Sequence, residues 1–236
     1  MLKRLFPLVI ISTVLALSGC GHYSAPEGPE QRESRSIDLD KSERVRVEIK
    51  MPVGELDTRG GAQKLLDADF TYNVPAWKPD VRYHSAGAIG DLAIEQHGPM
   101  SSGGNAKNHW DLRFNDTVPL DLRFEFGAGE ARLNLGSLSL RSINLEMGAG
   151  TLRLDLRGTP SRDYSVRVRG GVGEATVYLP KEVGISATAS GGIGDISVTG
   201  LRKSGDRYVN DAYERAAVKI NLDIQGGVGS IKLIAE

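Results

Sequence analysis

A short glycine motif recurs along the chain and restricts its fold more than any other feature. Between Tyr164 and Leu179, an alternating apolar strand runs into Gly-Val-Gly, and a second alternating strand follows. The second glycines of successive motifs, at 129, 150, 173 and 194, lie 21, 23 and 21 residues apart. A fixed period of about 20 to 50 residues is typical of repeat architectures. The motif pairs are Gly127 and Gly129, Gly148 and Gly150, Gly171 and Gly173, Gly192 and Gly194, and Gly227 and Gly229.

The segments between the motifs alternate apolar and polar residues with period two, as in Leu120 to Phe126. This pattern predicts strands with one buried and one solvated face. Because glycine permits positive φ and close backbone approach, each Gly-x-Gly predicts a sharp corner between strands. Corners at a near-constant step favour an all-β solenoid with two strands of about six residues per coil. An antiparallel β-sandwich stays open as the alternative. Weaker copies of the motif lie at residues 52–55 and 88–91.

The first 20 residues predict a lipoprotein signal peptide. Lys3 and Arg4 precede an apolar run that is too short to span a membrane, and Leu17-Ser-Gly-Cys20 closes it. This ending resembles the lipobox of bacterial lipoproteins, which implies that Cys20 is diacylated and becomes the mature N-terminus. Two or more acyl chains would give stable membrane attachment. We therefore expect an anchor in the cell membrane or outer membrane, with the domain facing the periplasm or the exterior.

The remaining chain predicts one tethered domain. Residues 21–36 are rich in proline, glycine and charge, which predicts a flexible tether, and residues 37–236 form the expected β repeat domain. The sequence contains 29 basic and 30 acidic residues, so no nucleic-acid partner is expected. Cys20 is the only cysteine, which excludes a disulfide within one chain. A lone thiol at this position also argues against a cysteine nucleophile and against a thiolate metal site.

A search for chemistry yields no site. A dinucleotide fingerprint needs a third glycine and a following helix, whereas strands follow these corners. Acids come directly after several corners, as at Glu130 and Glu174, but Thr151 and Ser230 interrupt the row. The four histidines have no metal-ligand spacing. We expect no catalytic residues, no metal and no cofactor, and an enzyme acting on envelope glycan stays open as an alternative because β-helices can hold such sites.

Candidate partner-binding residues lie where the repeat is interrupted. Residues 201–216 separate two repeats and contain Arg202, Arg207, Tyr208 and Tyr213, which are residue types found at interfaces. Trp77, in a proline-bounded turn, and Trp110, in a polar stretch, could stack on sugars or instead plug an end of the fold. The tyrosines could likewise fold back as a cap.

Several segments are similar to the bacterial toast-rack family. The resemblance rests on residues 70–79 (FTYNVPAWKP), residues 108–122 (NHWDLRFNDTVPLDL), the glycine corners, and residues 207–213 (RYVNDAY). It covers about residues 37–236 and implies a β-solenoid-like domain related to the sensor-side domain of LiaF-type cell-wall stress regulators. The family implies no catalytic residues.

The sequence therefore predicts a membrane-anchored envelope lipoprotein whose β domain is a non-enzymatic scaffold. Its partner would be a protein or a cell-envelope polymer. Modulation of cell-envelope stress signalling is the first alternative, and a carbohydrate-active enzyme on envelope glycan is the second.

Overall fold

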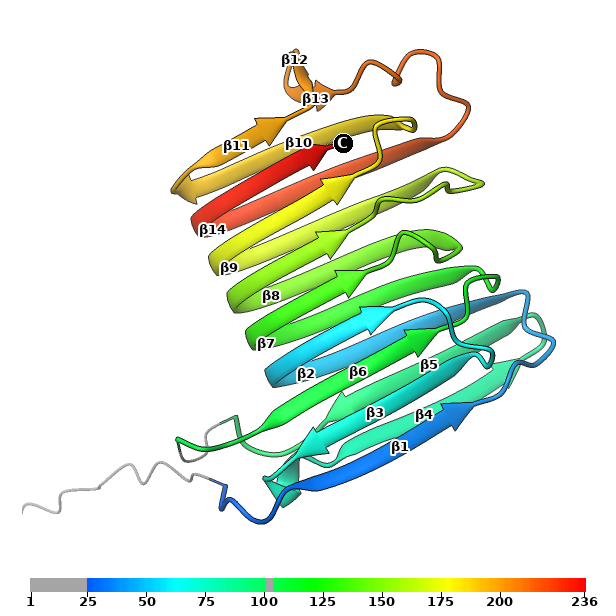
Figure 1. Cartoon of the computed structure of the whole chain (residues 1–236), viewed down its shortest axis with the longest axis vertical. Helices are drawn as coiled ribbons and strands as arrows, with labels where there is room; N and C mark the ends of the chain where they lie inside the picture. The colour runs from blue at the N-terminus through cyan, green and yellow to red at the C-terminus, as the bar shows by residue number, and fades with distance from the viewer. Residues whose placement is uncertain (1–24, 101–103) are drawn as a thin grey trace, which may run out of the picture.

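Strands stack in parallel, one rung above another, along most of the molecule (Figure 1). The computed structural model describes residues 25–100 and 104–236, so the predicted lipidation site Cys20 lies outside the described residues. The strands are β1 Gln31–Ile37, β2 Arg44–Arg59, β3 Leu66–Tyr72, β4 Pro79–Ala86, β5 Ile89–Gln96, β6 Asn108–Phe114, β7 Leu120–Asn134, β8 Leu140–Asp155, β9 Tyr164–Leu179, β10 Gly184–Ile193, β11 Ile196–Thr199, β12 Arg202–Ser204, β13 Arg207–Val209 and β14 Lys219–Ala235, with one 3-10 turn, η1, at Pro75–Trp77.

Each long strand bends at its glycine corner without a break. The first halves of β2, β7, β8, β9 and β14 form one wall, their second halves form the other, and the apolar core lies between the walls. The expected β-solenoid is thereby confirmed. The two short strands expected in each coil are instead joined into continuous strands of 15 to 17 residues.

The rungs stack in register, so like residues form rows along the solenoid. Val47, Leu122 and Ile143 lie in one buried row, because their strands pair in parallel at these positions. On the outer faces the same register brings opposite charges together, and Arg46 Nε lies 2.6 Å from Asp91 Oδ1 on the neighbouring rung. Period-two alternation in the sequence thus becomes one buried and one ion-paired face.

Antiparallel strands close the N-terminal end. β5 and β6 both pair with β2 in parallel, but a long loop replaces the glycine corner between them. Beyond this rung, β4 pairs with β5 and β3 pairs with β6, both antiparallel, and β1 adds to β3. The weaker motif copy at residues 88–91 is not a corner, because it lies at the hairpin between β4 and β5. The copy at residues 52–55 is a true corner, with Gly54 at a φ of 143°.

The predicted tether is wrong in its second half. Residues 31–36 belong to β1, which pairs with β3 over its full length. Further upstream, Ala25 is buried against Val74 and Trp77. The polar composition of β1 was misleading, because an edge strand is solvated on both faces and needs no apolar residues. The fold therefore starts before residue 37.

The strands of the C-terminal end do not stack in sequence order. β14 is the last strand of the chain, yet it lies between β9 and β10, pairing in parallel with both (Figure 1). β11 continues β10 past its corner and pairs with the second half of β14. The insertion at residues 201–216 contains the β12–β13 hairpin, which pairs with β10 at Ser186 and Ala187.

Candidate functional site

Two rows of glycines make the corners possible. The second glycines all have positive φ, between 128° at Gly150 and 141° at Gly173. A Cβ atom on Gly150 would lie 1.9 Å from the carbonyl oxygen of Gly129 on the rung below. The first glycines are also confined, since a Cβ atom on Gly148 would lie 2.5 Å from the Gly127 carbonyl oxygen. Any side chain in either row would separate the rungs.

A third set of glycines serves a different purpose. The inward position just before the corner holds Phe126 in β7 and Met147 in β8, but Gly170 in β9. The next two rungs hold Gly226 and Gly191 at this position. A Cβ atom on Gly170 would contact nothing within 4 Å, and its φ is not positive, so backbone geometry does not require glycine there. These glycines leave space beneath the corner.

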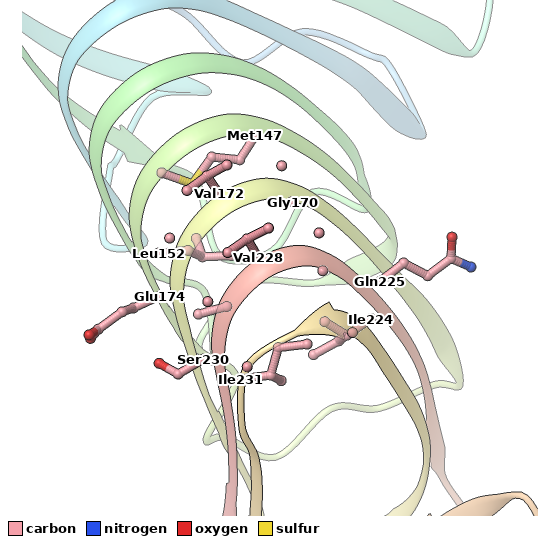
Figure 2. Close-up of a pocket in the computed structure, with 18 of the residues that line it drawn as sticks. Met147, Leu152, Gly170, Val172, Glu174, Ile224, Gln225, Val228, Ser230 and Ile231 are labelled. Atoms are coloured by element: carbon pink, nitrogen blue, oxygen red, sulfur yellow. The ribbon is translucent and has the colours of Figure 1, made fainter.

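The space forms a small apolar cavity of about 50 Å³. Its walls include Leu152, Ile224 and Ile231, which point into it, whereas Glu174 and Gln225 point away on opposite sides (Figure 2). Metabolite pockets have volumes of about 300 to 1,000 Å³. The cavity is therefore suited to one aliphatic side chain and is too small for a sugar. None of the residues that line it is aromatic, so it lacks the stacking platform expected of a glycan enzyme.

Four large apolar side chains surround the cavity at the surface. Val172 is 58% exposed, Val228 47%, Ile193 73% and Ile196 38%. Val172, Val228 and Ile193 each occupy the middle position of a Gly-x-Gly corner on adjacent rungs, whereas β7 and β8 hold the smaller Ala128 and Ala149 there. We call these four residues and the cavity the C-terminal corner. Contiguous exposed apolar side chains mark interaction sites.

An unpaired sheet edge adjoins the C-terminal corner. Among the described residues, β11 pairs with β14 alone, and β13 covers β10 only at Ser186 and Ala187. Residues 188–193 of β10 and all of β11 therefore present backbone N–H and C=O groups without strand partners on their outer side. Such an edge is a template for pairing with another strand. Exposed apolar groups and an open edge thus coincide at one end of the molecule.

Comparison with known proteins identifies the fold family. A family model described as the N-terminal domain of toast_rack, DUF2154, matches residues 26–178. The chain belongs to the toast-rack family. A second model, described as cell wall-active antibiotics response LiaF, C-terminal, matches residues 128–233, so this toast-rack domain is related to LiaF. The resemblance seen in the sequence is confirmed.

A solved structure from Clostridium sporogenes has the same fold as this chain. A candidate cell adhesion protein from Clostridium sporogenes is 31% identical, with a TM-score of 0.85, and the match covers 88% of this chain and 100% of that chain. A candidate adhesin from Bacteroides fragilis is 12% identical, with a TM-score of 0.35, and the match covers 88% of this chain and 99% of that chain. No curated protein matches the chain. Within residues 25–100 and 104–236, no helix has the length and apolar character needed to cross a membrane.

The structure excludes both tryptophans as exposed binding residues of the toast-rack domain. Trp77 and Trp110 are buried. The Trp77 indole N–H donates to the Pro99 carbonyl oxygen at 2.8 Å, and the Trp110 indole N–H donates to Asn108 Oδ1 at 3.0 Å. Trp110 also packs edge-to-face on Phe70 at the N-terminal end. They fill this end, as the alternative interpretation expected.

The insertion combines a cap with exposed cations. Asn210 is buried, accepting a hydrogen bond from the Ile185 N–H and donating to the carbonyl oxygens of Lys181 and Val183. Tyr208 and Tyr213 are half-buried, and Lys219 Nζ lies 4.8 Å from the Tyr213 ring centre. Arg202 and Arg207 are exposed. The tyrosines therefore belong to the cap, while the two arginines face solvent on the hairpin that pairs with β10 at Ser186 and Ala187.

One cluster of acidic and histidine side chains, on β4 and at the end of β5, belongs to an ion-pair network. Asp80, Glu95 and His97 lie close enough to one another to share a cation. However, Lys50 Nζ lies 3.0 Å from Glu95, and Arg82 contacts both Asp80 and Glu95. The hydrogen bond from Lys50 to Glu95 raises the pKa of that lysine. Two cations thus already neutralise these carboxylates, and we assign the cluster to an ion-pair network.

Sequence reasoning missed the C-terminal corner. The change from Ala128 and Ala149 to Val172, Ile193 and Val228 was visible in the motifs. The sequence also shows an additional glycine directly before the Gly-x-Gly pair in residues 170–173, 191–194 and 226–229. This additional glycine distinguishes the last three rungs from the earlier ones and could have located the site.

Proposed function

We propose that the protein is a lipid-anchored envelope protein whose toast-rack domain is a non-enzymatic binding module, with the C-terminal corner as its binding surface. One observation supports this most strongly: exposed apolar side chains coincide with an unpaired sheet edge at one end of the solenoid. The described chain starts at the opposite end (Figure 1). An anchor at Cys20 would therefore attach to the far end and leave the C-terminal corner accessible.

The relatives support a binding role. The Clostridium sporogenes structure is that of a candidate cell adhesion protein, and its match covers 88% of this chain. The exposed Arg202 and Arg207 are further candidate contacts, because they lie on the hairpin that pairs with the same strand, β10, at Ser186 and Ala187. The partner under this proposal is an envelope protein or polymer.

A role in envelope stress signalling is the second candidate. The LiaF-related match spans residues 128–233 and so includes the whole C-terminal corner. In this case the corner would bind a membrane protein of a signalling system rather than a structural polymer. Both candidates use the same surface and differ in the partner.

Site-specific photo-crosslinking in intact cells tests the proposal. A photoreactive amino acid at Ile193 should give adducts heavier than the monomer, whereas the same group at Arg153, which is exposed on the flat wall of β8, should not. The adducts should be found in the membrane fraction, and Cys20→Ser should remove them from that fraction. A protein adduct that resists glycan-degrading enzymes would favour signalling or adhesion to a protein. Equal adducts at Ile193 and Arg153 would contradict the proposed surface.

A further inference from the structure

A hollow lies on the outer face of the wall that the first strand halves form, near the C-terminal end of the molecule. Its floor belongs to β8, β9, β14 and β10, and the tip of the β12–β13 hairpin forms one side, with Asp206 and Arg207. Its volume of about 300 Å³ lies at the lower end of the range for small-molecule sites. Its lining residues differ from those of the C-terminal corner, so it is a separate surface.

The outer face of this wall changes its chemistry along the solenoid. Toward the N-terminal end its side chains form tight ion pairs, as between Arg46 and Asp91, whose Nε and Oδ1 atoms lie 2.6 Å apart. In the hollow, the same row of matched positions contains Ser165, Asn221 and Ser186. Parallel register places these side chains next to one another on adjacent rungs. The floor therefore presents a row of uncharged hydrogen-bonding groups.

Two arginines line the hollow without being held by their acidic neighbours. Arg167 Nε lies 3.7 Å from Asp223 Oδ2, and Arg207 Nε lies 3.8 Å from Asp206 Oδ1. Both distances are too long for a hydrogen bond, which needs about 2.7 to 3.2 Å. The two guanidinium groups therefore keep donors for a ligand, and the two carboxylates offer acceptors beside them.

A second hollow continues the first one along the solenoid. It lies over β4, β5, β2, β7 and β8 on the same wall and has a volume of about 570 Å³. Asn144 lines both hollows, so they adjoin at this residue. We call the two hollows together the wall groove. Because it runs across the strands over most of the rungs, it suits a chain-like ligand better than an isolated small molecule.

We propose that the wall groove binds a neutral glycan chain. This goes beyond the binding surface proposed above, because it uses another face of the molecule. The charges of the groove balance, with two arginines and two aspartates in the first hollow, and three arginines, three acids and one histidine in the second. A balanced lining does not select phosphate or another anion.

The hydrogen-bonding groups of the wall groove match those of a sugar. Neighbouring hydroxyl groups of a sugar both donate and accept hydrogen bonds, and planar guanidinium, carboxylate and amide groups can each contact two of them. Arg167, Asn221 and Asp223 supply one of each on adjacent rungs. Among the described residues, Tyr83 alone adds an aromatic ring to the groove, so recognition would depend chiefly on hydrogen bonds.

Binding to a glycan array tests the wall groove. The whole chain, fluorescently labelled and kept in a detergent without a sugar headgroup, is applied to an array of neutral and acidic oligosaccharides. Wild type should bind neutral oligosaccharides. Arg167→Ala should weaken this binding at least about tenfold and Asn221→Ala about threefold, because each removes hydrogen-bond donors from the groove.

Arg169→Ala is the matched control for Arg167→Ala. It removes the same charge from another exposed position of β9, but Arg169 does not line the wall groove, so its binding should equal that of wild type. Thermal melting checks that all three variants are folded. Since Arg167 and Asn221 lie outside the C-terminal corner, crosslinking at Ile193 should be unchanged in both variants.

Three results would overturn the proposal. The first is that wild type binds no neutral oligosaccharide on the array. The second is binding confined to acidic oligosaccharides, which would assign the groove to anions instead. The third is an equal loss with Arg167→Ala and Arg169→Ala, which would reduce the effect to the net charge of the wall. None of these results bears on the C-terminal corner, which the crosslinking experiment tests separately.

Discussion

The carbonyl oxygen of Gly173 lies 1.8 Å from the position that a Cβ atom on Gly229 would occupy, although Gly194 is the next corner glycine in the sequence. The rung that stacks on a corner must therefore have a glycine at the matching position. This holds whether the two rungs are near or far apart in the sequence. This relationship gives a sharp test of which glycines the fold requires.

Gly173→Ala and Gly170→Ala form a matched pair. Gly173 has a φ of 141° and no room for a Cβ atom, so its replacement should lower the free energy of unfolding by at least about 2 kcal/mol. Gly170 has open space and no positive φ, so the alanine should change stability by less than about 1 kcal/mol, in the stabilising direction. Denaturant melts measure both, and equal losses would contradict the distinction.

Cys20→Ser should abolish lipidation. The prediction rests on the sequence Leu17-Ser-Gly-Cys20, since the modified atom would be the sulfur of the only cysteine. Metabolic labelling with a palmitate analogue should mark the wild-type chain and leave the variant unlabelled and unprocessed at this site. Label on the variant would refute the lipoprotein assignment.

The insertion should separate into structural and binding residues. Asn210→Ala should lower stability by about 1 to 3 kcal/mol, because it leaves the Ile185 N–H and two carbonyl oxygens without their buried partner. Arg202→Ser combined with Arg207→Ser should change the free energy of unfolding by less than about 0.5 kcal/mol, because both side chains are exposed. The double variant should abolish partner capture, because both arginines are candidate contacts with the partner. Thermal melts and crosslinking at Ile193 measure the two effects. Wild-type capture by the double variant would restrict the insertion to a capping role.

Acid should remove a small part of the stability through Asp40. Hydrogen bonds, chiefly from the Ser42 hydroxyl and backbone N–H and also from the Tyr83 hydroxyl, lower the pKa of Asp40 from 3.8 to about 2. The contribution is fully present above the unfolded pKa, near 3.9, and is lost as the pH falls through about 2. Solvent screening at this exposed side chain limits it to less than about 1 kcal/mol.

Comparison of wild type with Asp40→Asn isolates the contribution of the Asp40 carboxylate to the free energy of unfolding. The asparagine variant should lose stability less steeply than wild type between pH 4 and pH 2, as measured by urea denaturation at fixed ionic strength. Identical slopes for the two proteins would show that the hydrogen bonds do not distinguish the charged carboxylate from the neutral one.

The sequence predicted the repeat but could not predict the order of its rungs. Alternation and Gly-x-Gly spacing are local, so they specified the strands and corners, and hence the solenoid, correctly. The position of β14 between β9 and β10 depends on which edges fit best in three dimensions, and no local pattern encodes it. The same limit applies to β1, whose residues read as a tether until β3 supplies a partner.

The site was harder still to predict from residue types. Trp77 and Trp110 were chosen because large aromatic side chains often bind partners, yet burial and internal hydrogen bonds place them at the N-terminal end of the core. The valines and isoleucines of the C-terminal corner looked like ordinary core residues. Only their middle position in a convex corner exposes them, and that is a property of the bend rather than of the residue type.

The insertion of β14 between β9 and β10 also bears on biogenesis. A chain that folds as its residues emerge can stack β2 and β5 to β9 in turn. Until residues 219–235 arrive, however, β10 has only its short pairing with β13 at Ser186 and Ala187, and β11 has no strand partner. The fold would thus be completed only by β14, and a chain truncated before Lys219 would leave the β10 and β11 segments available to proteases. The architecture would in this way make its own C-terminal segment a checkpoint for complete synthesis.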